Sequence, residues 1–240
     1  MVDFYQSPRC KICNKNGESI YSKSFNDEVL KLFFTTYYGE TKYKNFKNKL
    51  EATNYELLKC KDCKFVWQKN IPNKNFSIDL YENIIDNEQS LKKSKLKYHN
   101  QKNSNNKEIN KIIHNFNQEK INILDFGAGW GHWLMSGSNS FYDSYAFELS
   151  PSRKSFLISN GINVLNFNDI NQYLNFFHYI RLDQVLEHLN EPNEALKIIK
   201  KLGKKNCIFY ISVPDGTEII EKENIPFIRK GPVQPLEHLN

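Results

Sequence analysis

The sequence lacks any apolar run long enough to span a bilayer, which excludes a predicted transmembrane helix. Its first residues, Met1-Val-Asp-Phe-Tyr, do not have the pattern of a secretory signal peptide. It also lacks an arginine-rich cluster, and its net charge of +6 comes from lysines spread along the chain. Because dispersed lysine is typical of a solvated surface, nucleic-acid binding is not indicated. These absences favour a cytoplasmic protein without a membrane partner.

Cysteine is scarce, but four of the five cysteines form two pairs of the same spacing. Cys10 and Cys13 make one C-x-x-C pair, and Cys60 and Cys63 make the other. The two-residue gap lets both sulfurs of a pair bind one tetrahedral ion, so the pattern predicts a structural zinc site. Four unrelated reduced cysteines are the alternative. Cys207 stands alone in an apolar run and is predicted to be a core residue.

The first half of the chain is predicted to hold a zinc-binding module and a helical connector. The module, residues 1–75, contains both cysteine pairs, a helix within 27–38 and strands at 55–58 and 65–67. Because such a module has little core of its own, the metal would supply much of its folding energy. Residues 76–118 are predicted to form two helices separated by a loose segment at 101–106. These helices either cover a ligand or simply pack against their neighbours.

From residue 119 to residue 240, short apolar runs alternate with amphipathic segments. Strands are predicted at 121–124, 143–148, 162–165, 177–182 and 207–213. Helices are predicted from Trp133 onward and at 151–160, 169–174 and 191–202. This alternation predicts an α/β fold with a parallel, doubly wound sheet, in which ligands bind beyond the carboxyl ends of the strands.

The first of these strands runs into a glycine-rich turn that contains Asp125, Gly127, Ala128, Gly129 and Gly131. Glycine allows positive φ angles and a close approach of ligand to backbone. The spacing differs from the G-x-G-x-x-G of dinucleotide sites. The pattern D-x-G-x-G-x-G instead resembles the first motif of class I S-adenosylmethionine-dependent methyltransferases, in which the turn holds the amino-acid end of the cofactor. A glycine turn without a ligand is the alternative.

The same resemblance implies further cofactor-binding residues after the next strands. Glu148 would accept the ribose hydroxyls, since a carboxylate is a bidentate acceptor. Asp169, or Asn168 beside it, would reach the adenine amino group. Gln184 would also contribute to the cofactor site. Asp169 is alternatively a helix cap. The resemblance thus implies a Rossmann-like sheet with S-adenosylmethionine as cofactor, in a methyltransferase domain over residues 119–240.

The segment Asp183-Gln184-Val-Leu-Glu187-His188 resembles the D/N-x-V-L-E-H segment of the same family. The resemblance implies that Glu187 and His188 lie near the methyl donor, with histidine as the usual general base near neutral pH. Some relatives bind a divalent ion through an E-x-x-E-H triad. Gln184 replaces the first acid of that triad here, so a metal is not expected at this pair. The alternative is that the pair merely starts the next helix.

The last residues of the chain, 234–240, resemble the E-H-L segment that follows the fifth strand in this family. In zinc-containing sugar C-methyltransferases an E-H pair in this region helps to remove a proton from the substrate, which implies Glu237 and His238 as the corresponding pair. We therefore expect methyl transfer to a small-molecule acceptor, with a carbohydrate or related metabolite preferred. The alternatives are a non-catalytic binding protein with this fold, and an RNA or protein methyltransferase recruited through the zinc module.

The predicted sheet has fewer strands than the seven of class I methyltransferases. The residues after 213 are rich in proline, which removes the donors that a strand needs. We therefore expect a sheet that is cut short after its fifth strand, with apolar surface at an open edge and poor solubility. We also expect mobility around Glu237 and His238. A natural five-stranded protein is the alternative.

Overall fold

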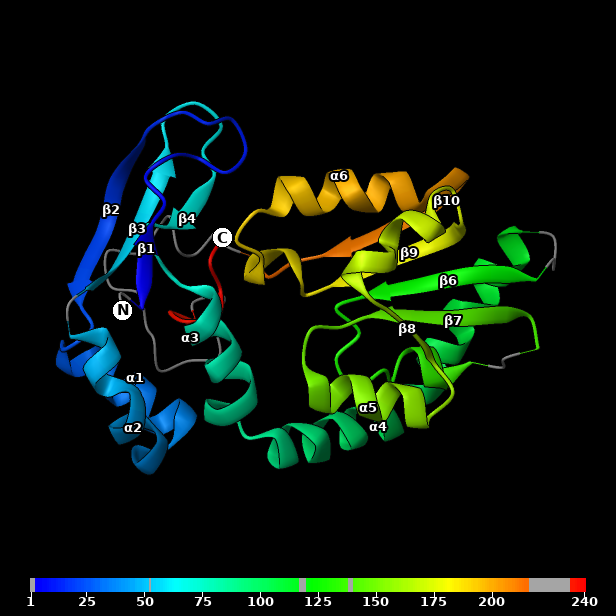
Figure 1. The fold of residues 1–240 in the computed structure, drawn as a ribbon, viewed down its shortest axis with the longest axis horizontal. Coiled ribbons are helices and arrows are strands. Elements are labelled where there is room, and N and C mark those ends of the chain that lie inside the picture. Colours follow the sequence, from blue (N-terminus) through cyan, green and yellow to red (C-terminus); the bar gives the residue numbers. More distant parts are fainter. Residues whose placement is uncertain (1–2, 52, 117–119, 138–139, 216–233) are drawn as a thin grey trace. The chain divides into compact units, whose positions relative to one another are not determined.

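The computed structural model describes residues 3–51, 53–116, 120–137, 140–215 and 234–240. Their elements are drawn in Figure 1, and they form two compact units. Unit 1 takes its residues from 1–86, 186–193 and 213–240, and unit 2 from 87–185 and 194–212. No helix among the described residues is long and apolar enough to cross a membrane.

Unit 2 is built on a five-stranded parallel sheet, which confirms the predicted α/β fold. The strand order is β10-β9-β6-β7-β8. The strands are β6 (Ile121–Phe126), β7 (Tyr142–Phe147), β8 (Asn163–Leu165), β9 (Phe177–Asp183) and β10 (Gly203–Ser212). The helices α5 (Pro151–Ser159) and α6 (Pro192–Leu202) connect β7 to β8 and β9 to β10. Strand β6 lies in the middle of the sheet, so the glycine turn that follows it leaves from the centre of the carboxyl edge.

Helix α4 (Asn87–Asn115) is continuous, so the predicted loose segment at 101–106 is wrong. The asparagines and the serine within 101–106 have weak helix propensity, but both ends of the helix are fixed by other elements. Ile109 and Ile113 are buried in the core of unit 2 together with Ile121 and Ile123. Near the other end, the Trp130 indole donates to the hydroxyl of a serine of α4, at 3.1 Å. Tertiary contacts therefore stabilise a helix that the local sequence does not favour.

The predicted helix after the glycine turn is reduced to one 3₁₀ turn, Leu134–Ser136. The Tyr142 hydroxyl of β7 donates to the Leu134 carbonyl at 2.8 Å, and a side chain at Gly137 would collide with Tyr142. The chain therefore turns toward β7 directly after this turn. The predicted helix at 169–174 is likewise a 3₁₀ segment, Phe167–Tyr173.

Strand β10 is the outermost strand of the sheet and exposes apolar side chains, as predicted. Ile208, Phe209, Tyr210 and Ile211 are between 37% and 47% exposed. No sixth strand is present in this sheet among the described residues. Most of the proline-rich segment on which the prediction of a shortened sheet depended, residues 216–233, lies outside them.

Unit 1 combines two small antiparallel sheets with three helices. One sheet has the order β2 (Gly17–Ser24), β3 (Asn54–Cys60), β4 (Val66–Gln68), and the other pairs β1 (Phe4–Gln6) with β5 (Asn70–Pro72). The helices are α1 (Glu28–Tyr38), α2 (Glu40–Leu50) and α3 (Lys74–Asp79), and a π-helical turn, Leu80–Ile84, extends α3. Helix α2 and strands β1, β2 and β5 were not predicted.

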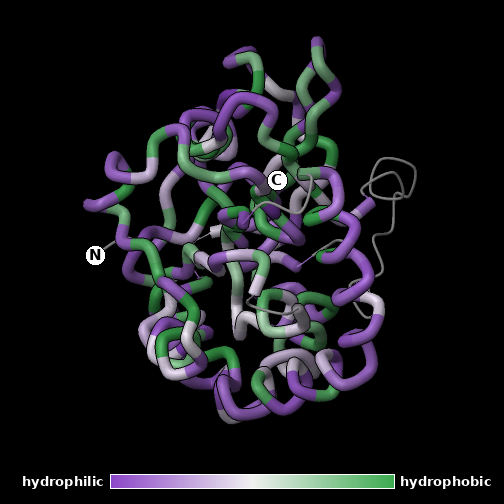
Figure 2. The backbone as a smooth tube through the Cα atoms, turned by 90° about the vertical axis from the view of Figure 1, so that its right-hand side faces the viewer, coloured by the Kyte–Doolittle hydropathy of each residue, from purple (hydrophilic) through white to green (hydrophobic). Residues whose placement is uncertain are grey.

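The core of unit 1 is rich in aromatic side chains, including Phe25, Phe34, Phe46 and Phe76, each at most 1% exposed. Figure 2 shows hydrophobic and hydrophilic positions interspersed along the chain. On α1 the buried side chains Leu30, Phe33 and Phe34 recur at helical spacing, so this helix buries one face. The module thus has a larger core than the sequence led us to expect. That core does not include the cysteines, which belong to a separate small cluster with Leu58 and Trp67.

Candidate functional site

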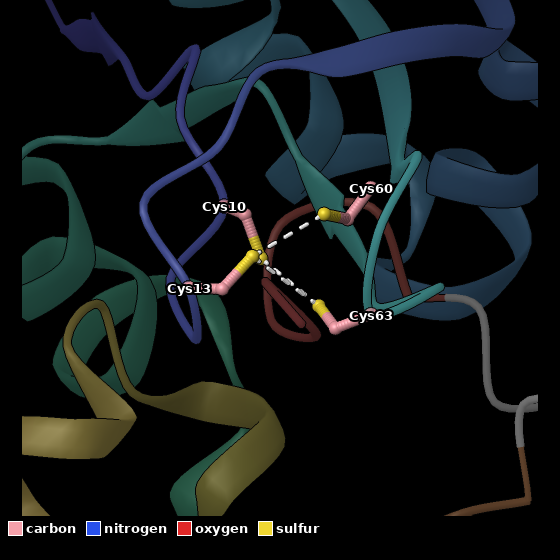
Figure 3. Close-up of side chains that lie close together, drawn as sticks. All are labelled: Cys10, Cys13, Cys60 and Cys63. Atoms are coloured by element: carbon pink, nitrogen blue, oxygen red, sulfur yellow. Dashed lines mark hydrogen bonds between the residues drawn. The ribbon is translucent and has the colours of Figure 1, made fainter.

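The four paired cysteines lie together in unit 1, and Figure 3 shows their sulfurs pointing toward one another. The Sγ–Sγ distance is 3.5 Å between Cys10 and Cys63, 3.4 Å between Cys13 and Cys60, and 3.7 Å between Cys13 and Cys63. A disulfide needs about 2.05 Å, so these sulfurs are not bonded to each other. Four sulfurs at about 2.3 Å from one tetrahedral zinc ion would be about 3.8 Å apart. The cysteine cluster therefore fits zinc.

The two cysteine pairs also share one backbone conformation. Cys10 N–H donates to the Lys15 carbonyl, and Cys60 N–H donates to the Phe65 carbonyl, both at 2.8 Å. The residue after each pair has a left-handed conformation, with φ 61° at Asn14 and 64° at Lys64. The Cys63 backbone N–H lowers the pKa of the Cys60 thiol to about 7, whereas the pKa values of the Cys10, Cys13 and Cys63 thiols are raised.

In unit 2 the glycine turn after β6 is held open by its three glycines. All have positive φ: 79° at Gly127, 57° at Gly129 and 69° at Gly131. A side chain at Gly127 would collide with Val185, and one at Gly131 would collide with Leu157. Gly129 differs, because the space beside its Cα is empty to 4 Å. Gly127 and Gly131 are thus required by close packing, whereas Gly129 leaves room for a ligand against the backbone.

A cavity of about 540 Å³ lies at this turn, within the usual range for small-molecule sites. Five predicted cofactor-binding residues line it: Asp125, Gly127, Ala128, Gly129 and Gly131. One face of α4 also lines the cavity with polar side chains: Ser90, Lys93, Ser94, Lys97, Tyr98, Gln101, Ser104 and Asn105. Of the two roles considered for this region, covering a ligand therefore agrees with the cavity. The sequence signal that could have predicted this role is the recurrence of polar residues at helical spacing along α4.

The other predicted cofactor-binding residues do not line this cavity. The Glu148 carboxylate accepts hydrogen bonds from the backbone N–H groups of Gly129, Leu149 and Ser150, at 2.8–2.9 Å. It therefore fixes the glycine turn, and three of its roughly four acceptor positions are in use. Asp169 is near Asn166, whose amide nitrogen is 3.4 Å from its carboxylate. The Gln184 side-chain amide donates a hydrogen bond to the Ser212 hydroxyl at 2.9 Å.

The two predicted Glu-His pairs, which are distant in the sequence, come together in unit 1. Atoms of Glu187, His188 and His238 lie within 4.8 Å of one another, and the two histidine rings are 4.8 Å apart. His188 Nδ1 is 2.9 Å from the Glu237 carbonyl oxygen, and its Nε2 is 3.9 Å from Glu187 Oε1. A proton on Nδ1 would be donated to that carbonyl, and in the neutral ring this tautomer places the basic lone pair on Nε2.

The last residues of the chain are held in place around this cluster, so the predicted mobility of Glu237 and His238 is wrong. Leu239 N–H donates to the Glu187 carbonyl at 2.6 Å, and Gln68 N–H donates to the Leu239 carbonyl at 2.9 Å. Glu237 is 8% exposed. Backbone pairing of this kind depends on contacts between distant segments, which a local reading of the sequence does not predict.

Two tyrosines of this cluster were missed by the sequence analysis. The Tyr38 hydroxyl, at the end of α1, donates to Glu237 Oε1 at 2.8 Å. The Tyr81 hydroxyl, in the π-helical turn, is 3.3 Å from His188 Nδ1. Burial raises the pKa of Tyr38 well above its usual value, so its hydroxyl remains a donor. No sequence signal distinguishes them from the other tyrosines, because only the fold places them here.

Residues 98–239 match the family described as a methyltransferase domain. Three solved structures similar to the chain are the [4+2]-cyclase SpnF, the YcgJ protein from Bacillus subtilis and an S-adenosylmethionine-dependent methyltransferase from Aquifex aeolicus. Their sequence identities to the chain are 17%, 19% and 21%, with TM-scores of 0.34, 0.31 and 0.32. The alignments cover 38%, 38% and 40% of this chain and 38%, 42% and 57% of those structures. Curated protein sequences gave no match.

The five-stranded parallel sheet with a glycine turn at its centre is the fold class of S-adenosylmethionine-dependent methyltransferases. Because the family match extends over more than half of the chain, the protein belongs to the methyltransferase-domain family. Membership implies S-adenosylmethionine as the methyl donor and a methyl acceptor as the substrate.

Proposed function

We propose that this chain transfers the methyl group of S-adenosylmethionine to a small-molecule acceptor, with a carbohydrate or related metabolite as the preferred class. The observation that carries the proposal is the cavity of about 540 Å³ at the glycine turn, where Gly129 leaves the backbone open to a ligand. The family match over residues 98–239 includes this turn.

The cofactor would be held mainly by the backbone of the glycine turn at Gly127–Gly131. Glu148 fixes this turn through Gly129 N–H and has about one acceptor position left for a ribose hydroxyl. Asp169, or Asn168 beside it, remains the proposed partner of the adenine amino group, and Gln184 remains a proposed cofactor-binding residue. The sulfonium supplies an electrophilic methyl group, so the protein contributes orientation and, for a weakly acidic acceptor, a base.

We assign the proton-accepting role to the Glu-His cluster of unit 1. The contact of His188 Nδ1 with the Glu237 carbonyl would leave Nε2 as the proton acceptor, and the buried Glu187 would stabilise the protonated ring. His238 is the other candidate base. The proposed structural zinc on Cys10, Cys13, Cys60 and Cys63 would have no part in the chemistry, because four thiolates complete its coordination.

The preference for a carbohydrate rests on the combined sequence pattern. A zinc module before the domain and a Glu-His pair at 237–238 together resemble zinc-containing sugar C-methyltransferases. An RNA substrate is not favoured, because the lysines are dispersed rather than gathered in a basic patch.

The test is methyl transfer from labelled S-adenosylmethionine to three acceptor sets: nucleotide sugars and free sugars, total RNA, and protein extract. We expect label in a sugar product. His188→Ala or His238→Ala should lower the transfer rate about 10²- to 10⁴-fold while leaving cofactor affinity unchanged. His114→Ala, at an exposed position of α4, is the control. Cofactor binding without transfer to any set would favour the non-catalytic alternative.

A further inference from the structure

The first cysteine loop (residues 10–13) lies against the segment of unit 1 that carries the first Glu-His pair. The Asn193 side-chain amide donates to the backbone carbonyls of Lys11 and Ile12, at 2.8 and 3.3 Å. Lys11 Nζ also contacts Glu191 Oε1 at 2.9 Å. The residues shortly after this Glu-His pair are therefore fixed to the first cysteine loop by two backbone carbonyls and one charge.

The second cysteine loop (residues 60–63) leads into strand β4, which holds the other Glu-His pair. Gln68, the last residue of β4, is fully buried. Its backbone N–H donates to the Leu239 carbonyl at 2.9 Å, and its side-chain amide donates to the Pro235 carbonyl at 2.6 Å. The Glu-His pair at 237–238 lies between these two carbonyls in the sequence. Each cysteine loop is therefore connected to one of the two Glu-His pairs.

The two cysteine loops share one backbone conformation but differ in the lysine that follows the first cysteine. In the second loop this residue is Lys61, which is 68% exposed and whose Nζ is 3.7 Å from Glu18 Oε2, a contact that solvent weakens. In the first loop it is Lys11, whose side chain is only 5% exposed where it meets Glu191. The zinc geometry alone does not explain an enclosed lysine, because the second loop has the same geometry with an exposed one.

One tetrahedral zinc ion would take two sulfurs from each cysteine loop and so lock the loops together. The His188 and His238 rings, which the loops reach through these contacts, are 4.8 Å apart. We propose that Lys11 and Asn193 are positioning residues for His188, and that zinc, by joining the loops, sets the distance between the two Glu-His pairs. The assignment rests on the proposed function, which makes this cluster the proton acceptor. The ion then supports the reaction without touching a reactant.

A contact that needs no metal also joins the two sides. The Trp67 indole of β4 donates to the Ser7 carbonyl, which precedes the first cysteine loop, at 2.8 Å in a buried position. One hydrogen bond fixes a single point, whereas an ion with four protein ligands also fixes the relative orientation of the two loops. We therefore expect the spacing of the two Glu-His pairs to depend on zinc even when the Trp67 contact is present.

The test is nuclear magnetic resonance of the whole chain with labelled histidines, so it needs no acceptor. Zinc-loaded wild-type protein should give a nuclear Overhauser effect between the His188 and His238 rings, because these rings are in contact. Removal of zinc with a chelator should abolish this effect. Calorimetry on the same zinc-free sample should give an affinity for S-adenosylmethionine within about threefold of the wild-type value, because the glycine turn belongs to unit 2.

Two variants test the contacts without removing a sulfur. Asn193→Asp replaces the donating amide with an acceptor, and Lys11→Met removes the ammonium group. Both should keep zinc, weaken the effect between the histidine rings, and accelerate hydrogen exchange of the Leu189 amide, which bonds within the same segment, by about tenfold or more. Lys61→Met is the matched control and should change none of these. Lys11→Glu combined with Glu191→Lys restores the pair with its charges exchanged and should recover most of the effect.

An unchanged effect in zinc-free protein would mean that the Trp67 contact is sufficient, and would overturn the role of the ion. Behaviour of Lys11→Met and Asn193→Asp like that of Lys61→Met would overturn the positioning role, and an absent effect in wild-type protein would refute the whole assignment. If Lys11→Met loses its zinc, Asn193→Asp and the charge-exchanged pair decide. Wild-type protein that shows the effect but transfers no methyl group would refute the proposed function and leave the positioning contacts in place.

Discussion

The two units hold their polar sites in different ways. In unit 2 the site is made by the backbone of one glycine turn and by residues at the ends of neighbouring strands. In unit 1 both sites are made by groups from separate segments: the Cys10 sulfur meets the Cys63 sulfur at 3.5 Å, and the His188 ring meets the Glu237 backbone carbonyl at 2.9 Å. A site of the first kind depends on the sheet, which has its own hydrophobic core. A site of the second kind depends on whatever holds the segments together.

For the cysteine cluster, that stabilising element would be the zinc ion that its geometry fits. The cluster shares its buried surface with only a few residues, chiefly Leu58 and Trp67. A structural zinc ion contributes about 10 kcal/mol or more to the folding of small zinc domains. The comparison therefore predicts that metal loss affects unit 1 far more than unit 2. Four predictions test this difference between the units, and they are given from the largest expected effect to the smallest.

Cys60→Ser should abolish zinc binding and unfold the region around the cysteines, because a neutral hydroxyl replaces one of four thiolates. Metal analysis should give about one zinc ion per wild-type chain and much less in the variant. Hydrogen exchange should then accelerate in β3 and β4 while β6 stays protected. Cys207→Ser, which removes the unpaired cysteine of β10, should keep its zinc. Equal acceleration in both units would show that unit 2 does not fold independently of the metal.

Gly129→Arg should abolish cofactor binding and leave zinc in place. The side chain would enter the cavity, and φ of 57° is unfavourable for any residue other than glycine. We expect at least about a 100-fold loss of affinity for S-adenosylmethionine, or about 3 kcal/mol, by calorimetry.

Gly161→Arg is the matched control for this variant. Gly161 also has a positive φ, 75°, and open space beside it, but it is an exposed residue that does not line the cavity. Its replacement should carry the same backbone strain without a loss of affinity. A similar loss in both variants would mean that strain, rather than occupation of the cavity, weakens binding.

Short-range patterns of the sequence predicted the parts of each site that one segment makes alone. The repeated C-x-x-C predicted the cysteine cluster, because two residues of spacing set the sulfur geometry. Alternation of apolar runs predicted all five strands of unit 2. The glycine turn was predicted from D-x-G-x-G-x-G, because positive φ angles restrict the choice of residue.

Contacts between distant segments could not be predicted in this way. The continuity of α4 depends on packing at both of its ends. Its asparagines, read locally, indicated a loose segment at 101–106 instead. Tyr38 contacts Glu237 only because the fold brings these distant residues together. Arg181 likewise lines the cavity beside Asp125 only because β9 pairs with β6. The expected mobility of the last residues was wrong for the same reason.

The stability of unit 2 should depend on pH through Asp125. Its folded pKa, about 6, is above the ordinary value of 3.8 because the carboxyl is buried. The folded state therefore binds the proton more tightly, so the free energy of unfolding is highest at low pH and falls as pH rises from about 4 to about 6. The decrease amounts to at most about 3 kcal/mol.

Asp125→Asn should remove this dependence, which urea unfolding at pH 4, 5, 6 and 7 would measure. Asp143→Asn is the control, because its carboxylate is 40% exposed on the same sheet and pairs with Lys120 at 2.8 Å. It should keep the wild-type slope. If Asp125→Asn also kept that slope, the Asp125 carboxyl would be more open to water than its burial indicates.

The smallest expected effect is at Tyr38, and it tests whether unit 1 depends on single side-chain contacts. Tyr38→Phe removes the hydrogen bond at 2.8 Å to the buried Glu237 carboxylate, so unit 1 should lose about 1.5–3 kcal/mol in chemical unfolding. Tyr5 of β1, which is 38% exposed, is the control, and Tyr5→Phe should change stability by less than about 0.5 kcal/mol. If the two variants were equally stable, the segment 234–240 would be held by its backbone bonds to Gln68 and Glu187, and unit 1 would resemble unit 2 more closely than we propose.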